Sequence, residues 1–254
     1  MKTCIIAPIG MSPPVITEMV EYIIQVESGF VSNVVLIATA NREVLESVEI
    51  VKAALQIRYP RIHTHVVELP FSDISSMEDN IEFMRVCANV IREEREKYGC
   101  DYIYLNVAGG RKDMCISLSL LAQLIDVDGV FHIIHPDVTV FNEMLERIRK
   151  EISDLYESED KVAFYEEHKQ KFDEVMFPPL SAFNVIRIPC VPFPKDGLGA
   201  IVEILCSETL IKKEETKLDE RELKRLKKAG LISIIGRGVY STEFGKAIGS
   251  LWKA

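Results

Sequence analysis

The 254-residue sequence lacks the glycine-rich motifs of the common nucleotide-binding enzymes, since neither GxGxxG nor GxxxxGKS/T occurs in it. In those motifs, the glycines let backbone N–H groups approach a pyrophosphate or triphosphate closely. Their absence argues against a dinucleotide-dependent enzyme and against a P-loop NTPase. We therefore expect no cofactor.

Long apolar segments are also missing. No run of 18 consecutive apolar residues occurs, and the apolar run at the N-terminus is interrupted at Pro8 and Gly10. A helix that spans a bilayer needs about 20 apolar residues, and the N-terminal run is too short for a signal peptide. We therefore expect a cytoplasmic protein without membrane contact.

Cysteine is present, but no two cysteines are spaced as CxxC. Several lie in apolar segments, where a reduced thiol acts as a small hydrophobic group. The pattern indicates neither a disulfide framework nor a zinc site, so no metal ligand is assigned. The six residues are Cys4, Cys87, Cys100, Cys115, Cys190 and Cys206.

The net charge of −9 argues against a protein that coats nucleic acid, because such binding needs a broad basic surface. The charge is unevenly distributed. Residues 200–254 contain eleven Lys and Arg against eight Asp and Glu, a net of +3, which leaves −12 for residues 1–199. We expect two domains with this division.

Apolar runs rich in Val, Ile and Tyr alternate with helical periodicity. Strands are predicted at residues 3–7, 33–38, 64–69, 102–107, 130–134 and 185–188. Helices are predicted at residues 18–26, 42–57, 80–98 and 113–125. Because parallel strands need crossover connections, this alternation predicts an α/β fold with a mainly parallel sheet and helices on both faces.

The segment DYIYLNVAGGRKDM, residues 101–114, leads from a strand through Gly109 and Gly110 to Arg111 and Lys112. Glycines let backbone amides approach a ligand, and the helix predicted behind them points its unpaired N–H groups outward. Two cations oppose the helix dipole, so the pattern favours a bound anion. The alternative is that both cations simply point into water.

A second loop follows the first predicted strand, where APIGMSPP places Ser12 at the strand's carboxyl end. In an open parallel sheet, ligands bind beyond those ends, so Ser12 and the Gly109–Lys112 loop would face one pocket. The alternative is that Ser12 only caps the next helix, as serine before proline often does.

Residues 141–178 are helical in pattern and heavily charged, and they precede the last predicted strand. An insertion of this kind is a candidate lid. Lys169 and Lys171 lie beside two glutamates, so the alternative is a solvated face with helical charge pairs, which also applies to His168.

Two further histidines lie at the fifth predicted strand. His132 alternates with apolar neighbours, which is typical of a packed residue. His135 comes at the strand's carboxyl end and is better placed for a pocket.

The tail resembles a winged helix. Residues 218–229 form a basic amphipathic pattern, a two-stranded wing turns at residues 236–238, and residues 242–251 are helical. In such modules the helix before the wing can enter a major groove. Three acids at residues 219, 220 and 222 dilute the basic face, so we expect the module to pack against a partner subunit, with DNA binding as the alternative.

Three features carry a family resemblance: APIGMSPPVITE at one strand end, NVAGGRKDM at another, and a charged helical insertion after the fifth strand. With them, residues 1–195 resemble the CRISPR-associated CARF-domain proteins, in particular the archaeal ring nucleases. The resemblance implies a Rossmann-like fold and a homodimer. It also implies a cleft across the dimer axis that binds cyclic oligoadenylate, the signalling ring of type III CRISPR defence.

The resemblance further implies that cyclic tetra-adenylate is cleaved to linear diadenylate without a metal, because a ribose 2′-hydroxyl attacks its adjacent phosphate. Ser12 and Lys169 would be catalytic, with Lys171 and His168 as alternatives to Lys169. The preference between rings of four and six adenylates is left open. The expected ligand contacts are Gly10, Met11, Asn106, Gly109, Gly110, Arg111, Lys112, His132 and His168.

Other functions compete with cleavage. The chain could be a non-cleaving CARF sensor that regulates transcription through its winged helix, or a CARF-like protein that binds another anion. A CARF effector with its own HEPN ribonuclease domain is disfavoured, because that domain uses a histidine and none follows His168.

Overall fold

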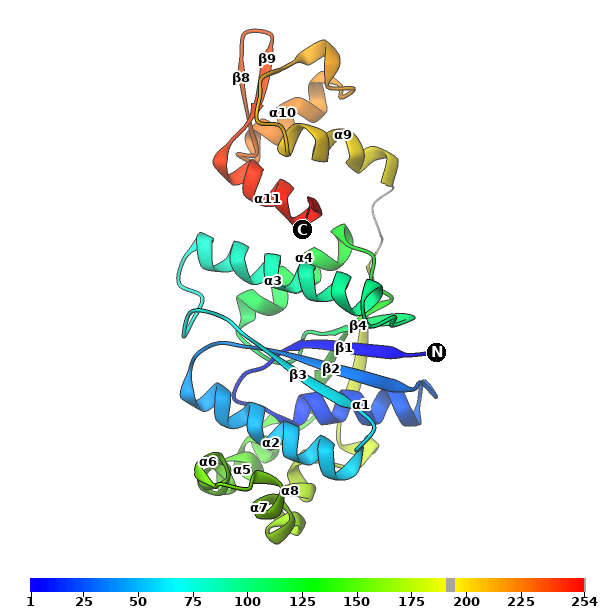
Figure 1. Cartoon of the computed structure of the whole chain (residues 1–254), viewed down its shortest axis with the longest axis vertical. Helices are drawn as coiled ribbons and strands as arrows, with labels where there is room; N and C mark the ends of the chain where they lie inside the picture. Colours follow the sequence, from blue (N-terminus) through cyan, green and yellow to red (C-terminus); the bar gives the residue numbers. More distant parts are fainter. Residues whose placement is uncertain (191–194, 254) are drawn as a thin grey trace.

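The computed structural model describes residues 1–190 and 195–253 and is built around a six-stranded sheet of order β3-β2-β1-β4-β5-β6 (Figure 1). The first five strands are parallel, and β6 is antiparallel to β5. The predicted mainly parallel α/β fold is therefore confirmed. The strands are β1 (Thr3–Pro8), β2 (Val31–Ala38), β3 (His63–Glu68), β4 (Tyr102–Asn106), β5 (Gly129–Ile134) and β6 (Asn184–Ile188).

The order of the strands creates a switch point beside β1. The chain proceeds outward from β1 to β2 and β3, then returns to place β4 on the other side of β1. The connections after β1 and β4 therefore leave the sheet in opposite directions and open a crevice beyond their carboxyl ends. Both glycine-containing loops predicted from the sequence lie at this crevice.

Helices cover both faces of the sheet, as the alternation predicts (Figure 1). Helices α1 (Pro14–Gln25) and α2 (Arg42–Arg58) cover one face, and α3 (Met77–Glu96) and α4 (Lys112–Leu124) cover the other. β1 and β2 are buried along their whole length, because side chains on both of their faces pack against helices. Each face therefore has its own apolar core.

Helix α1 begins four residues earlier than its apolar spacing predicts. Pro14 occupies its first turn, where a missing N–H costs no hydrogen bond, and Glu18 is buried inside the helix instead of starting it.

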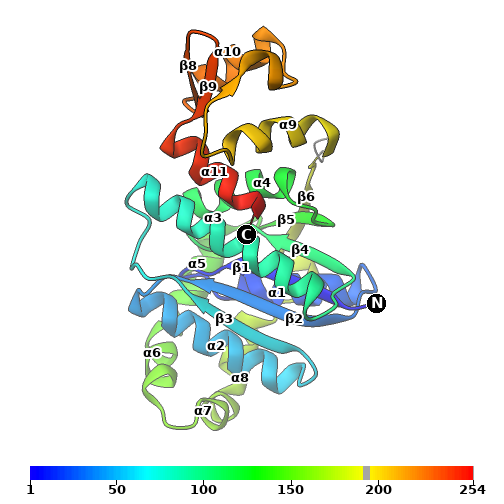
Figure 2. The same cartoon turned by 45° about the horizontal axis from the view of Figure 1, so that its top comes forward.

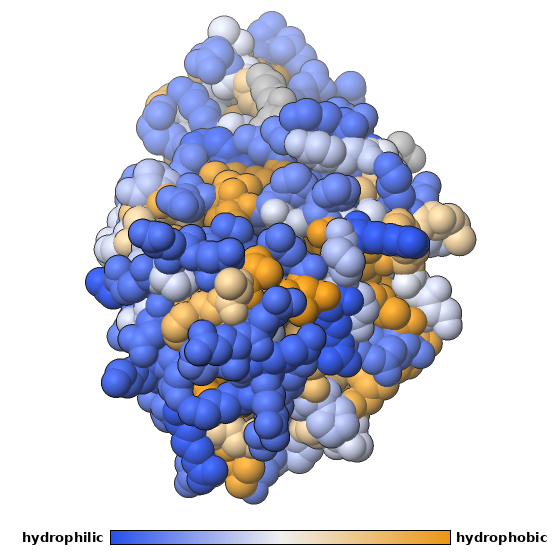
Figure 3. Space-filling view, turned by 60° about the horizontal axis from the view of Figure 1, so that its bottom comes forward, coloured by the Kyte–Doolittle hydropathy of each residue, from blue (hydrophilic) through white to orange (hydrophobic). Residues whose placement is uncertain are grey.

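The insertion comprises four short helices packed beneath α2 and α1 (Figure 1). It begins at Val138, three residues before the predicted start, because Asp137 accepts a hydrogen bond from Val140 N and caps the first helix. Its exposed side chains are mostly hydrophilic on the face shown in Figure 3. The helices are α5 (Val138–Arg147), α6 (Arg149–Glu157), α7 (Lys161–Glu167) and α8 (Lys169–Met176), and η1 (Leu180–Ala182) leads on to β6.

The C-terminal module has its own three-stranded sheet, of order β7-β9-β8, and its own apolar core (Figure 2). Helix α11 packs against α3, where Leu251 is buried and its carbonyl accepts a hydrogen bond from Arg92. The elements are α9 (Lys195–Leu205), β7 (Ile211–Lys212), η2 (Lys213–Glu215), α10 (Glu220–Lys228), β8 (Ile232–Ile235), β9 (Gly238–Ser241) and α11 (Glu243–Lys253).

The predicted wing therefore forms, as β8 and β9. Helix α9 spans the boundary expected between residues 199 and 200, so we infer that the division between the two parts precedes this helix. Within the described ranges, no helix is both long enough and apolar enough to cross a membrane.

Candidate functional site: a glycine-lined crevice at the switch point

The loops after β1 and β4 touch one another through glycines. A Cβ added to Gly109 would lie 2.5 Å from the carbonyl oxygen of Pro8, and one added to Gly10 would lie 3.1 Å from the backbone nitrogen of Gly110. Gly110 also has φ +80°, a conformation that residues with a Cβ rarely adopt. The glycines are thus required for the close approach of the two loops.

Asn106, the last residue of β4, joins this loop to α1. Its Nδ2 donates to the carbonyl of Val15 at 2.8 Å, and its Oδ1 accepts from Ala108 N at 3.0 Å. The side chain is fully buried, and both ends of the amide are engaged inside the protein. These contacts agree with a turn-forming role, whereas the expected ligand contact of Asn106 finds no support in this geometry.

Beside the loop contact lies a pocket of about 350 Å³. The loops after β1 and β4 form two of its walls. The third wall is formed by Thr39 after β2 and by the start of α2, where Asn41 caps the helix by accepting a hydrogen bond from Glu43 N at 2.9 Å. The sequence reasoning missed this wall, because nothing local to residues 39–43 indicates that β2 lies next to β1. The predicted residues that line the pocket are Gly10, Met11, Ser12, Gly110 and Arg111.

Ser12 is half-buried at the edge of this pocket. The residue that caps α1 is Pro13, and no side chain makes a capping hydrogen bond there. The alternative reading of Ser12 as a helix cap is therefore wrong. Its hydroxyl makes no hydrogen bond to any described residue, so it is available to a ligand.

Arg111 has a partner within the protein. Its Nη2 lies 2.6 Å from Oδ2 of Asp73, which comes from the segment after β3. Both side chains are largely exposed, and ion pairs of this kind contribute only about 0 to 1 kcal/mol, so an anion can compete for the guanidinium. Lys112 occupies the first position of α4, is exposed and does not line the pocket.

Cys115 holds the second loop in place from within α4. Its thiol donates to the carbonyl of Gly109 at 3.1 Å. Burial raises the pKa of Cys115 to about 11, so this thiol stays protonated at neutral pH and remains a donor.

The insertion reaches the first loop through Arg149. Its Nη1 donates to the carbonyl of Met11 at 3.1 Å. On the same turn of α6, Glu151 lies 2.8 Å from Nζ of Lys171, and the hydrogen bond from Lys171 lowers the pKa of Glu151. The first contact ties the insertion to the Ser12 loop, and the second holds Lys171 of α8 against α6. No sequence pattern singled out Arg149.

Lys169 is exposed at the first position of α8 and makes no ion pair with any described residue. His168 stacks on Phe164 with ring centroids 4.4 Å apart, and its Nδ1 lies 3.0 Å from the Phe164 carbonyl. Neither residue lines the pocket beside Ser12. Lys171 is engaged by Glu151, which leaves Lys169 as the lysine at the start of α8 without a charge partner.

His132 and His135 lie away from this pocket. Nδ1 of His132 is 3.1 Å from the Val107 carbonyl, and the ring faces a shallow surface pocket between α4 and β6. Nε2 of His135 is 2.8 Å from Oε1 of Glu18 at the edge of a larger, mainly apolar pocket of about 460 Å³. His135 therefore does border a pocket, as its place at the strand end predicts.

Glu18 is fully buried, and its Oε2 has no hydrogen-bond partner in the described part of the chain. Desolvation raises the pKa of this carboxyl, and the hydrogen bond from His135 offsets that effect only in part.

Within residues 1–190 and 195–253, no group of three or more His, Cys, Asp or Glu side chains is placed to hold a metal ion.

The fold and the crevice together define an open α/β protein with a glycine-lined pocket at the switch point of a mainly parallel sheet. Comparison of the sequence with known protein families narrows this broad class to one family. A family model for CRISPR-associated protein NE0113 matches residues 12–223, and the chain belongs to this family.

The chain is also similar to one curated protein and to one solved structure. The chain is 25% identical over 172 residues to the CRISPR system ring nuclease SSO2081 of Saccharolobus solfataricus, an alignment that covers 66% of this chain and 90% of that protein. A solved structure of Enterococcus italicus Csm6 bound to cyclic hexa-2′-fluoro-hexa-dAMP aligns with a TM-score of 0.49 and 17% identity. That alignment covers 80% of this chain and 46% of the Csm6 chain.

Proposed function

We propose that this protein is a ring nuclease that binds cyclic tetra-adenylate and cleaves it to linear diadenylate ending in a 2′,3′-cyclic phosphate. One observation carries the proposal: two loops from neighbouring strand ends meet through glycines, beside a pocket that contains an unbonded serine hydroxyl. The ring nuclease among the relatives of this chain supports the same activity.

The pocket offers the groups that such a reaction requires. A ribose 2′-hydroxyl gives up its proton and attacks the adjacent phosphorus, the P–O bond to the 5′-oxygen of the neighbouring ribose breaks, and this 5′-oxygen takes up a proton. The protein therefore supplies no nucleophile, and its task is to hold the attack in line and stabilise negative charge on the phosphate. The amides at the start of α4, the Ser12 hydroxyl and Arg111 suit that task, and the exposed Lys112 would join them from outside the pocket.

The insertion would add a further cation. Lys169 is our choice because it is exposed and has no charge partner among the described residues, whereas Lys171 is bound to Glu151 and His168 is stacked on Phe164. The Arg149 bond to Met11 links the insertion to the Ser12 loop.

A homodimer would complete the site, because a cyclic tetra-adenylate has two-fold symmetry and a two-fold dimer presents each loop twice. A candidate interface lies next to Lys112, where Ile116 and Leu120 of α4 are 60% and 54% exposed. The same side of the sheet adds Ile134 and Ile186, which are also exposed. Exposed apolar groups this close together mark an interaction surface.

The deciding experiment is incubation of purified protein with cyclic tetra-adenylate in EDTA, with products separated by chromatography. We expect linear diadenylate, and single-turnover rates lower by about 100-fold in Ser12→Ala and Lys169→Ala, in line with the loss of one stabilising donor. Ring binding by both variants should persist. Lys171→Ala is the matched control and should change the rate by less than about threefold, since its cation is already neutralised by Glu151.

Other outcomes have definite meanings. Loss of cleavage in Lys171→Ala but not in Lys169→Ala would move the catalytic role to Lys171. Tight binding of an uncut ring would exclude the nuclease and leave the non-cleaving sensor. Cleavage that stops in EDTA would exclude the metal-independent mechanism.

A further inference from the structure

We propose that the C-terminal module binds duplex DNA, with the exposed face of α10 in the major groove. The order of elements is that of a helix-turn-helix followed by a wing: α9, β7, the short η2, α10, and then the β8–β9 hairpin. Helix α10 therefore occupies the position of the second helix of the pair, the one that reads DNA in such modules.

The face of α10 that points away from the module core carries a stripe of cations. Leu223 and Leu226 point inward, and Leu223 is buried with Ile232 and Val239. The opposite face carries four exposed cations at spacings of three and four residues, which places them on one stripe. These are Arg221, Lys224, Arg225 and Lys228.

The acids near this helix do not lie on that stripe. Asp219 accepts from Glu222 N, and Glu222 accepts from Asp219 N, both at 2.7 Å, so the two carboxylates form a capping box. Glu220 lies 3.8 Å from Lys224 at the border of the stripe. The sequence predicts that all three acids dilute the basic face, whereas in the structure Asp219 and Glu222 cap the helix.

The wing adds a cation beside this helix. Arg237 is exposed at the hairpin tip between Gly236, with φ +57°, and Gly238, and it makes no ion pair with any described residue. A hairpin tip of this kind is suited to a phosphate or a minor-groove edge.

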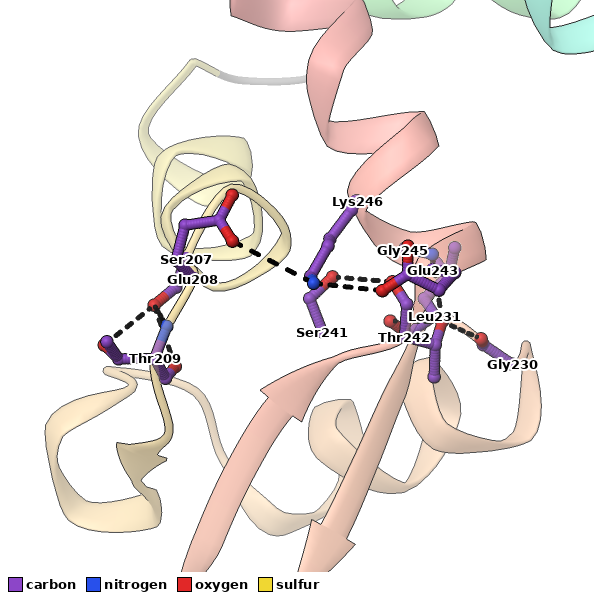
Figure 4. Close-up of polar contacts among 10 residues, drawn as sticks. All are labelled: Ser207, Glu208, Thr209, Gly230, Leu231, Ser241, Thr242, Glu243, Gly245 and Lys246. Carbon is purple, nitrogen blue, oxygen red and sulfur yellow. Dashed lines mark hydrogen bonds and ion pairs between the residues drawn. The ribbon is translucent and has the colours of Figure 1, made fainter.

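The module holds α10 in a defined orientation (Figure 4). Thr242 Oγ1 donates to the carbonyls of Gly230 and Leu231, which directly follow α10, and accepts from Gly245 N at 2.9 Å. A Cβ on Gly245 would lie 1.9 Å from the Leu231 carbonyl, so α11 and the turn after α10 are in direct contact. The stripe is thus presented by a rigid scaffold.

Not every cation in the module is available. Lys246 lies 3.0 Å from Glu243 and 4.0 Å from Glu208 (Figure 4). It lies on α11 and not on the α10 stripe, and its ammonium group faces two carboxylates, which makes it the matched control for the stripe.

Duplex DNA fits this surface better than other polyanions. The major groove of DNA admits an α-helix, whereas that of duplex RNA is too deep and narrow for its base edges to be read. The local net charge of +3, within a protein of net charge −9, gives attraction confined to this module. The proposal does not depend on ring cleavage.

The test is fluorescence anisotropy of a labelled mixed-sequence 24-base-pair DNA, titrated with the full-length protein up to about 50 μM at 50 to 200 mM salt, where non-specific contacts are measurable. We expect Arg221→Ala/Arg225→Ala to weaken binding at least tenfold and to reduce the salt slope by about 2, since each phosphate contact contributes about 0.9. Lys246→Ala should stay within twofold.

Several outcomes would overturn the proposal: no binding at 50 mM salt, equal losses in the stripe and control variants, or equal affinity for duplex RNA or poly-glutamate. The stripe variant should cleave the cyclic ring at the wild-type rate in the same preparation. That assay separates a failure of DNA binding from a failure of the nuclease proposal.

Discussion

A single methyl group at Gly109 would meet the carbonyl oxygen of Pro8 at 2.5 Å, closer than real contacts allow. We predict that Gly109→Ala separates the two loops, costs about 1 to 3 kcal/mol in the free energy of unfolding, and weakens ring binding at least tenfold. Urea unfolding and a titration with cyclic tetra-adenylate measure the two effects.

The control is Gly199→Ala in α9, where an added Cβ meets nothing within 4 Å. Removing a glycine from a helix interior should stabilise the protein by about 0.5 to 1 kcal/mol. If the two variants behave alike, the contact between the loops is not what requires glycine at position 109.

The buried carboxyl of Glu18 leads us to expect that the stability of the protein depends on pH. Because desolvation raises its pKa in the folded protein, the folded state holds this proton more tightly than the unfolded state. That contribution to stability is present below the ordinary glutamate pKa and is lost as pH rises through the raised pKa.

We predict that Glu18→Gln, which retains an acceptor for His135, loses less stability than the wild type as the pH rises through this window. Denaturant unfolding at a series of pH values measures the difference between the two proteins. A constant difference across the series would contradict a raised pKa.

At the scale of elements, the contact between α6 and the loop after β1 joins the insertion to the pocket. We predict that Arg149→Ala, which removes the bond to the Met11 carbonyl, lowers the ring-cleavage rate at least tenfold. The loss of stability should be only about 1 kcal/mol, the size of one hydrogen bond.

Arg147→Ala is the paired control. Arg147 is exposed, and its ion pair with the exposed Glu143 is long, at 3.9 Å, so it contributes little. It should leave both the cleavage rate and the stability unchanged. Single-turnover kinetics and urea unfolding on the two variants compare the roles directly, and equal rates would show that the link between α6 and the loop is only structural.

At the scale of the whole molecule, a charge on the exposed face of α4 tests the proposed homodimer. We predict that Leu120→Asp shifts the protein from dimer to monomer in sedimentation experiments and lowers ring affinity at least tenfold, because a buried, unpaired carboxylate is costly. Val26→Asp, at an equally exposed apolar position at the end of α1, should remain dimeric. A wild-type monomer that cleaves the ring would contradict the proposed site.

Local patterns in the sequence were enough to predict six strands, four helices of the sheet domain, the glycine loop before α4 and the wing of the C-terminal module. Each of these follows from periodicity or from backbone chemistry within a few residues. The place of Ser12 beside the second loop also followed, because parallel strands bring their carboxyl ends to one edge.

The tertiary structure decided what each polar group contacts. It engaged Asn106 with Val15, paired Arg111 with Asp73, and brought Arg149 to Met11 from a segment 138 positions away. It also engaged two acids at the start of α10 in a capping box, which leaves the stripe of four cations on the opposite face. These outcomes depend on the order of strands and the packing of distant segments. A single sequence shows which polar groups the protein has. Which of them contact each other across long sequence separations is decided only when the chain folds.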